Sequence, residues 1–225
     1  MPRDEYQAAL TDLERDVSEM GDLVLGRLDD ALEALASNED ALARAVIEGD
    51  DEINKRYLAL EQECIDLLAL QQPVAGDLRF VTASFKVLTD LERVGDLAVN
   101  LADYTLDAEE GRALDVDVHD IGLDARAMVA DALDAYASAD PEACMTIADR
   151  DDELDARCRR ANEHVVRDLI VREVDADDPW AVERLMDDVS RTLLTIRDLE
   201  RVGDHAVNVA ARTLYMVETD ASLIY

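Results

Sequence analysis

The amino-acid sequence predicts an all-α protein, built as two tandem repeated three-helix bundles. Three observations lead to this prediction: an internal repeat, few helix-breaking residues, and no long stretch with the period-2 pattern of a β-strand. The 225 residues include only four prolines and eight glycines, which permits long helices. Apolar residues make up 49% but aromatic residues only 4%, so we expect a core of mainly leucine, valine, isoleucine and alanine.

The internal repeat is clearest in one charged motif. DLERVGDLAVN at 90–100 returns as DLERVGDHAVN at 198–208, and the copies differ only where His205 replaces Leu97. Earlier in the chain, DALEALASNED at 30–40 resembles DALDAYASADP at 131–141. The offset is 101 residues for the earlier pair and 108 for the later pair, so the second half contains a longer loop, which fits REVDADDPW at 172–180.

The repeat divides the chain into two similar halves, residues 1–110 and 111–225, and each half is predicted to form three antiparallel helices. Residues 109–117 are predicted to be the linker. Pro141 and Pro179 stand at expected helix starts, where the missing N–H costs nothing. We expect helices near Glu5–Ala36, Glu39–Leu70 and Val74–Ala108 in the first half, and near Val118–Ser138, Pro141–Val174 and Trp180–Glu218 in the second.

The charge is extremely negative. Acidic residues number 54 against 22 basic residues, a net charge of −32, and Lys55 and Lys86 are the only lysines. Such a surface indicates adaptation to high salt, where screening weakens self-repulsion. It also argues against binding to nucleic acid or anionic lipid, since both require a basic face.

The sequence also indicates where the protein resides. The three cysteines, Cys64, Cys144 and Cys158, show no CxxC spacing and are expected to be buried free thiols in a reducing compartment. The N-terminal stretch MPRDEYQAAL has no apolar signal-peptide region, and no run of 18 apolar residues occurs. We therefore expect a soluble, cytoplasmic protein.

Polar residues spaced four apart on the third helix of each half form the candidate site. Glu92, Asp96 and Asn100 share one face, and the second half repeats the stripe with Glu200, Asp204 and Asn208. Gly95 and Gly203 lie in the apolar seams beside these stripes. Glycine within a helix costs about 1 kcal/mol against alanine, so we expect a neighbouring helix to come close there.

The second helix of each half supplies acidic partners. Asp50 and Asp151 interrupt its apolar seam at equivalent positions, and Asn54 and Asp155 follow one turn later. Unpaired carboxylates on a packing face are costly, so something must neutralise them. Arginine is one candidate, and a metal ion bound by oxygen ligands is the other. The arginines near the stripes are Arg79, Arg93, Arg191 and Arg201, and His205 is a further candidate ligand, although a single histidine more often has a surface or packing role.

These motifs resemble those of the PhoU family of phosphate-uptake regulators over nearly the full length. The resemblance rests on RAVIEGDDEIN at 44–54, VAGDLRFVTASFKVLTDLERVGD at 74–96 and DLERVGDHAVN at 198–208. It implies metal binding, with iron, zinc, manganese or magnesium as the ion. The implied ligands are Glu92 and Asp96 with Asp50 and Asn54, and Glu200 and Asp204 with Asp151 and Asp155.

Two positions depart from the expected symmetry. Asn54 replaces an acid that would complete the first site, and Leu185 stands where the first half has Asp77. The two sites are therefore expected to differ in metal content or affinity.

The resemblance implies a non-enzymatic negative regulator of phosphate uptake. Such proteins act on the ATPase subunit of the phosphate ABC transporter and, in bacteria, on a membrane sensor kinase, and they are usually dimers or larger assemblies. Three alternatives stay open: a carboxylate-bridged metalloenzyme, a regulator of a different phosphate permease, and a salt-adapted bundle with stripes that are solvated or paired with arginine. Di-iron helical bundles use a Glu-x-x-His pattern on two helices, and the single His205 does not supply it, which counts against the metalloenzyme.

Overall fold

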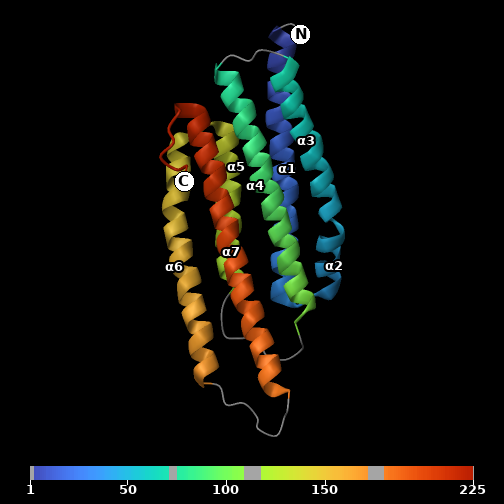
Figure 1. Cartoon of the computed structure of the whole chain (residues 1–225), viewed down its shortest axis with the longest axis vertical. Helices are drawn as coiled ribbons and strands as arrows, with labels where there is room; N and C mark the ends of the chain where they lie inside the picture. The colour runs from blue at the N-terminus through green and yellow to red at the C-terminus, as the bar shows by residue number, and fades with distance from the viewer. Residues whose placement is uncertain (1–2, 71–74, 109–117, 172–179, 225) are drawn as a thin grey trace.

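Long, roughly parallel helices form a single bundle in the computed structural model of the chain (Figure 1). The structure describes residues 3–70, 75–108, 118–171 and 180–224. Within these ranges all the regular structure is helical, which confirms the all-α prediction. The helices are α1 (Arg3–Ser37), α2 (Asp40–Glu48), α3 (Asp50–Leu70), α4 (Ala75–Leu106), α5 (Val118–Ser138), α6 (Pro141–Val171) and α7 (Ala181–Glu218).

The second helix of the first half is broken, where the sequence predicted one helix from Glu39 to Leu70. The break falls at Gly49, between α2 and α3. The Arg27 guanidinium of α1 lies against Gly49 and would overlap any side chain at this position. It donates to the Ala45 carbonyl at 3.4 Å and pairs with Glu52 at 3.2 Å, so it bonds to the chain on both sides of the break.

The turn before this helix preserves the duplication. Asn38 and its equivalent Ala139 both adopt the left-handed conformation, with φ of 52°. Asp140 then caps α6, because its Oδ1 accepts hydrogen bonds from the Glu142 and Ala143 backbone N–H groups at 2.9 and 3.2 Å. The predicted helix start at Pro179, the predicted helix end at Val174 and the linker at 109–117 lie outside the described residues.

The two halves share one core. Helix α4 packs on α7, and α1 packs on α5, so the first and third helices of each half face the other half. The second helices lie outside this layer, with α6 at one edge of the bundle and α2 and α3 at the other (Figure 1). Two repeated three-helix units are thus confirmed, and one continuous set of buried side chains joins them.

Two further features bear on the protein's environment. Cys64, Cys144 and Cys158 are buried free thiols, as predicted. No helix in the described ranges combines the length and apolar composition that a membrane span requires.

Candidate functional site

The first carboxylate cluster comprises Asp50 and Asn54 on α3 with Glu92 and Asp96 on α4. Asn54 Nδ2 donates to Asp50 Oδ2 at 2.6 Å. Arg93, also on α4, pairs with Glu92 at 3.5 Å and with Asp96 at 3.1 Å. This cluster is therefore partly neutralised by arginine.

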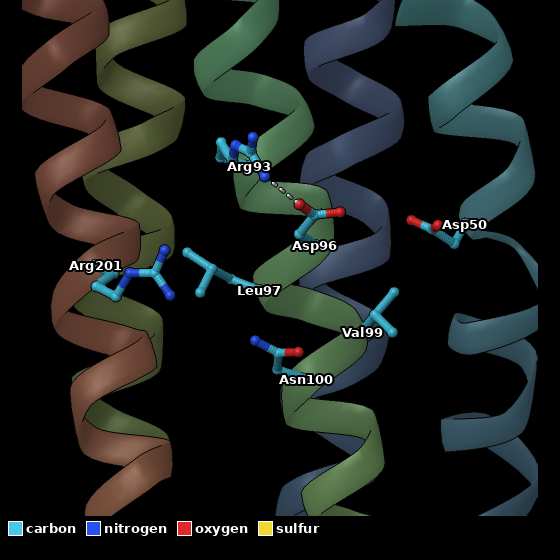
Figure 2. Close-up of a pocket in the computed structure, with 7 residues that line it drawn as sticks. All are labelled: Asp50, Arg93, Asp96, Leu97, Val99, Asn100 and Arg201. Atoms are coloured by element: carbon cyan, nitrogen blue, oxygen red, sulfur yellow. Dashed lines mark hydrogen bonds and ion pairs between the residues drawn. The ribbon is translucent and has the colours of Figure 1, made fainter.

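A hollow of about 250 Å³ opens beside this cluster. Figure 2 shows Asp50 pointing from α3 towards Asp96 on α4, while Arg201 reaches in from α7. Burial, followed by the charge of Asp96, raises the pKa of Asp50. The same two causes, in the same order, raise the pKa of Glu92. The acids are thus close enough to repel one another despite Arg93.

The second carboxylate cluster comprises Asp151 and Asp155 on α6 with Glu200 and Asp204 on α7. Burial, followed by the charges of Asp155 and Asp204, raises the pKa of Asp151 to about 6. Burial and then Asp155 also raise the pKa of Glu200. Among the residues that the structure describes, no arginine or lysine forms an ion pair with any of the four carboxylates. Arg201, which lies beside this stripe in the sequence, forms its ion pair with Asp198 at 3.6 Å, although its charge also acts on Asp204.

Asp151 carries the clearest sign of a missing partner. Its Oδ1 is buried and has no hydrogen bond. A buried polar atom without a partner costs about 1–3 kcal/mol, so native proteins rarely leave one without a reason.

The glycines beside both clusters mark close helix contacts, as predicted. A Cβ on Gly95 would lie 3.2 Å from Ile53 Cδ1 of α3. A Cβ on Gly203 would overlap Leu154 Cδ2 and lie 3.2 Å from Asp151 Oδ1. Glycine at these positions therefore lets the second helix of each half approach the third, which brings the two sets of acids together.

Asn100 and Asn208 do not complete the stripes as the spacing suggested, because they point across to the other half. Asn100 Nδ2 donates to Asp198 Oδ2 at 3.1 Å, and Asn208 Nδ2 donates to Asp90 Oδ1 at 3.1 Å. His205 Nδ1 also lies 2.9 Å from Asp90 Oδ1. This contact joins the two halves and gives no support to His205 as a metal ligand.

Asp198 is the most enclosed acid of this contact and is fully buried. The Tyr104 hydroxyl donates to its Oδ2 at 2.9 Å, and Arg197 donates to its Oδ1 at 3.0 and 2.8 Å. Burial and the hydrogen bond to Asp198 raise the pKa of Tyr104 to about 12. Asp90 and Asp198 were not predicted as site residues, although each is the first residue of one copy of the repeated motif.

Arg79 and Arg191, the other two arginines near the stripes in sequence, lie apart from the clusters. Arg191 pairs with Asp188 and donates to the Asp107 carbonyl at 2.7 Å, so it ties the start of α7 to the end of α4. The Nε atom of Arg79 is buried without a hydrogen bond.

Comparison with known proteins identifies the fold. The sequence profile of the PhoU domain matches residues 17–105 and 118–213, once in each half. The chain belongs to the PhoU domain family.

Curated relatives match over almost the whole chain. The phosphate-specific transport system accessory protein PhoU homolog of Pseudomonas aeruginosa is 35% identical over 216 residues, covering 95% of this chain and 85% of that protein. The corresponding PhoU protein of Escherichia coli K12 is 30% identical over 216 residues, with coverage of 95% and 86%.

Solved PhoU structures have the same fold. The crystal structure of PhoU from Pseudomonas aeruginosa has a TM-score of 0.82 and 32% identity, covering 96% of this chain and 100% of that one. The phosphate transport system regulatory protein PhoU from Streptococcus pneumoniae has a TM-score of 0.85 and 28% identity, with coverage of 96% and 98%.

The donor atoms of both clusters are of the kind that binds a hard cation. Both offer oxygen donors, and the second offers four carboxylates, one of which has an unpartnered buried oxygen. Within the described ranges, however, no three histidine, cysteine or carboxylate side chains surround a common point. Cation binding therefore requires these side chains to rotate towards one another, and the metal site remains a prediction.

Proposed function

We propose that this chain is an accessory protein of a phosphate-specific transport system and lowers phosphate uptake when phosphate is plentiful. One observation carries the proposal: relatives named for this role match 95% of the chain, across both halves. A solved relative with the same fold is described as a regulatory protein of phosphate transport.

The proposed mode of action is docking without catalysis. The partner is the ATPase subunit of the phosphate ABC transporter, and a sensor kinase is a second partner in organisms that have one. A homodimer is the expected assembly. The long, continuously packed helices support this role, because a rigid bundle presents fixed surfaces to a partner.

The proposed cation sites would stabilise the bundle. Asp151, Asp155, Glu200 and Asp204 would hold a cation between α6 and α7, and Asp50, Asn54, Glu92 and Asp96 would hold another between α3 and α4. The bound ion would supply positive charge that offsets the repulsion raising the pKa values of Asp151 and Glu200. The all-oxygen donor set suits magnesium, manganese or iron better than zinc.

Deleting the gene in the source organism and measuring phosphate uptake in phosphate-rich medium tests the proposal. Uptake is expected to rise, and the wild-type gene is expected to restore the low rate. Unchanged uptake would contradict the regulatory role. Co-purification with the transporter ATPase subunit tests the mode of action separately, because altered uptake without co-purification contradicts only the docking step.

A further inference from the structure

The end of the α6–α7 pair projects beyond the rest of the bundle (Figure 1). Helix α1 of the first half has 35 residues, whereas its counterpart α5 has only 21. At 1.5 Å per residue, the difference is about 20 Å of helix. Within the described residues, the C-terminal part of α6 and the first turns of α7 therefore have less helix beside them than the corresponding part of the first half has.

This projecting end exposes apolar side chains. Ile170, Val171 and Trp180 are 79%, 72% and 62% exposed, the highest values for large apolar residues in the part of the chain that the structure describes. Beside them, a shallow hollow of about 500 Å³ lies along one face of α6. We define the α6 face as the residues that line it, spaced three and four apart: Arg159, Asn162, Glu163, Val166, Arg167 and Ile170.

Unpaired arginines accompany the apolar residues. Arg160 and Arg167 form no ion pair or hydrogen bond within the described residues, although the chain carries a net charge of −32, whereas the charge of Arg159 acts on Glu200 of α7. Elsewhere, arginines join neighbouring helices through carboxylates. Such pairs are Arg56 with Glu19, Arg126 with Asp29, Arg150 with Asp131 and Arg157 with Asp124.

We propose that the α6 face binds an acidic amphipathic helix of a partner protein. The apolar residues Val166 and Ile170 would pack on the apolar stripe of that helix. Arg160, which flanks the α6 face, is seven residues from Arg167, so both lie on one side of α6, where they would pair with the carboxylates of the partner helix. This is the same arginine–carboxylate contact that already joins α6 to α5 through Arg157 and Asp124.

Charge favours this occupant over two others. The α6 face carries more arginines than acids, with Glu163 its only carboxylate, so a twofold contact between two copies would leave positive charge unpaired. An anionic membrane is a broad surface that would meet much of the acidic chain, whose net charge is −32, whereas a single helix contacts only the α6 face and its arginines. The proposal depends neither on the cation sites nor on the role in phosphate uptake.

Titration of the full chain with a labelled helical peptide tests the proposal. The probe is about 18 residues long, with leucine at every third or fourth position and glutamate on both flanks, and a second probe carries glutamine in place of glutamate. Fluorescence anisotropy measures binding at fixed ionic strength. The proteins are the wild type, Arg160→Glu/Arg167→Glu, Ile170→Asp, and two controls outside the face, Arg44→Glu and Leu58→Asp.

The glutamate probe is expected to bind the wild type and both controls saturably, and to bind the double arginine variant and Ile170→Asp about tenfold or more weakly. Replacing glutamate by glutamine in the probe should weaken binding to the wild type but not to the arginine variant. The proposal is overturned by any of three results. The first is no saturable binding of the glutamate probe to the wild type up to about 1 mM. The second is an equal affinity of this probe for the wild type and the variants. The third is a loss of affinity in the arginine variant that is the same for the glutamate probe and the glutamine probe.

Two further measurements decide against the other occupants. Sedimentation velocity should give the same oligomeric state for the wild type and Ile170→Asp, and a dimer that this change dissociates would assign the face to a second copy. Wild-type protein should not pellet with phosphatidylserine vesicles. Pelleting that Arg160→Glu/Arg167→Glu abolishes would assign the face to a membrane, and either result would overturn the proposal.

Discussion

Asn100 on α4 donates a hydrogen bond to Asp198 on α7 at 3.1 Å, across the boundary between the two halves. The reverse contact, from Asn208 on α7 to Asp90 on α4, has the same length. Each contact joins the last residue of one copy of the repeated motif to the first residue of the other copy. The motif therefore has two separate roles, because its outer residues join the halves and its inner acids face the second helices.

Replacing Asn100 by alanine should destabilise the fold by about 1–2 kcal/mol. The change removes one donor from the fully buried carboxylate of Asp198, which leaves that charge less well bonded. Asn208→Ala should cost less, since Asn208 is exposed. Urea unfolding at constant salt measures both values. Asp103→Ala, at an exposed position on α4, is the control. If Asp103→Ala and Asn100→Ala lower the free energy of unfolding equally, the contact between Asn100 and Asp198 has no particular role in stability.

Asp151→Asn should stabilise the cation-free protein above about pH 7. The pKa of Asp151 in the folded state, about 6, lies above the ordinary value of 3.8, so the folded chain binds this proton more tightly than the unfolded chain does. The ionised Asp151 therefore destabilises the fold above pH 6. This destabilisation disappears as the pH falls through 6 towards 4 and the folded chain takes up the proton. The expected gain at high pH is about 1 kcal/mol after allowance for solvent screening.

Unfolding curves across this pH range, with chelator present, make the comparison. Asp149, two residues away on α6, is exposed and is the matched control. Asp149→Asn should leave the pH dependence unchanged. A pH profile for Asp151→Asn that runs parallel to wild type would show that Asp151 does not titrate in this way.

Gly203→Val should destabilise the protein by about 2 kcal/mol, because the new side chain overlaps Leu154 and crowds Asp151 where α6 meets α7. Gly26 on α1 has nothing within 4 Å of the place its Cβ would occupy. Gly26→Val should therefore change stability by less than about 0.5 kcal/mol. Thermal unfolding of the two variants tests the close contact, and equal effects would argue against it.

Arg93→Ala should raise cation affinity at the first carboxylate cluster about fivefold. Arg93 pairs with both Glu92 and Asp96, so it competes with a cation for the same oxygens. Isothermal titration with manganese or magnesium measures the change. Arg44→Ala removes the same charge from an exposed position on α2. An equal gain in cation affinity in Arg44→Ala would mean that Arg93 acts only through the net charge of the chain.

Periodicity predicted much of the fold because it is a property of sequence. The repeat predicted three helical segments in each half, and the seam positions of Gly95 and Gly203 predicted where helices come close. The break at Gly49 escaped prediction because it depends on Arg27, which reaches it from α1. A pattern read along one helix does not show a side chain that arrives from another.

The candidate site shows the same limit. Spacing of four residues grouped Asn100 with Glu92 and Asp96, but the packing of α4 on α7 directs Asn100 to Asp198. The choice between arginine and metal also depended on packing. Arg93 bonds to the acids of the first cluster, whereas Arg201 pairs with Asp198 and leaves the second cluster without an ion pair in the described part of the chain.

Metal content after equilibrium dialysis most directly tests the claim that carboxylates from α6 and α7 bind a cation. Wild-type protein, Asp155→Asn/Asp204→Asn and the control Asp152→Asn/Glu153→Gln are dialysed together against the same concentration of manganese, magnesium or iron, and bound metal is counted per chain. The account predicts that the Asp155/Asp204 variant loses about one ion per chain and that the control loses none. Equal metal in all three proteins would contradict it.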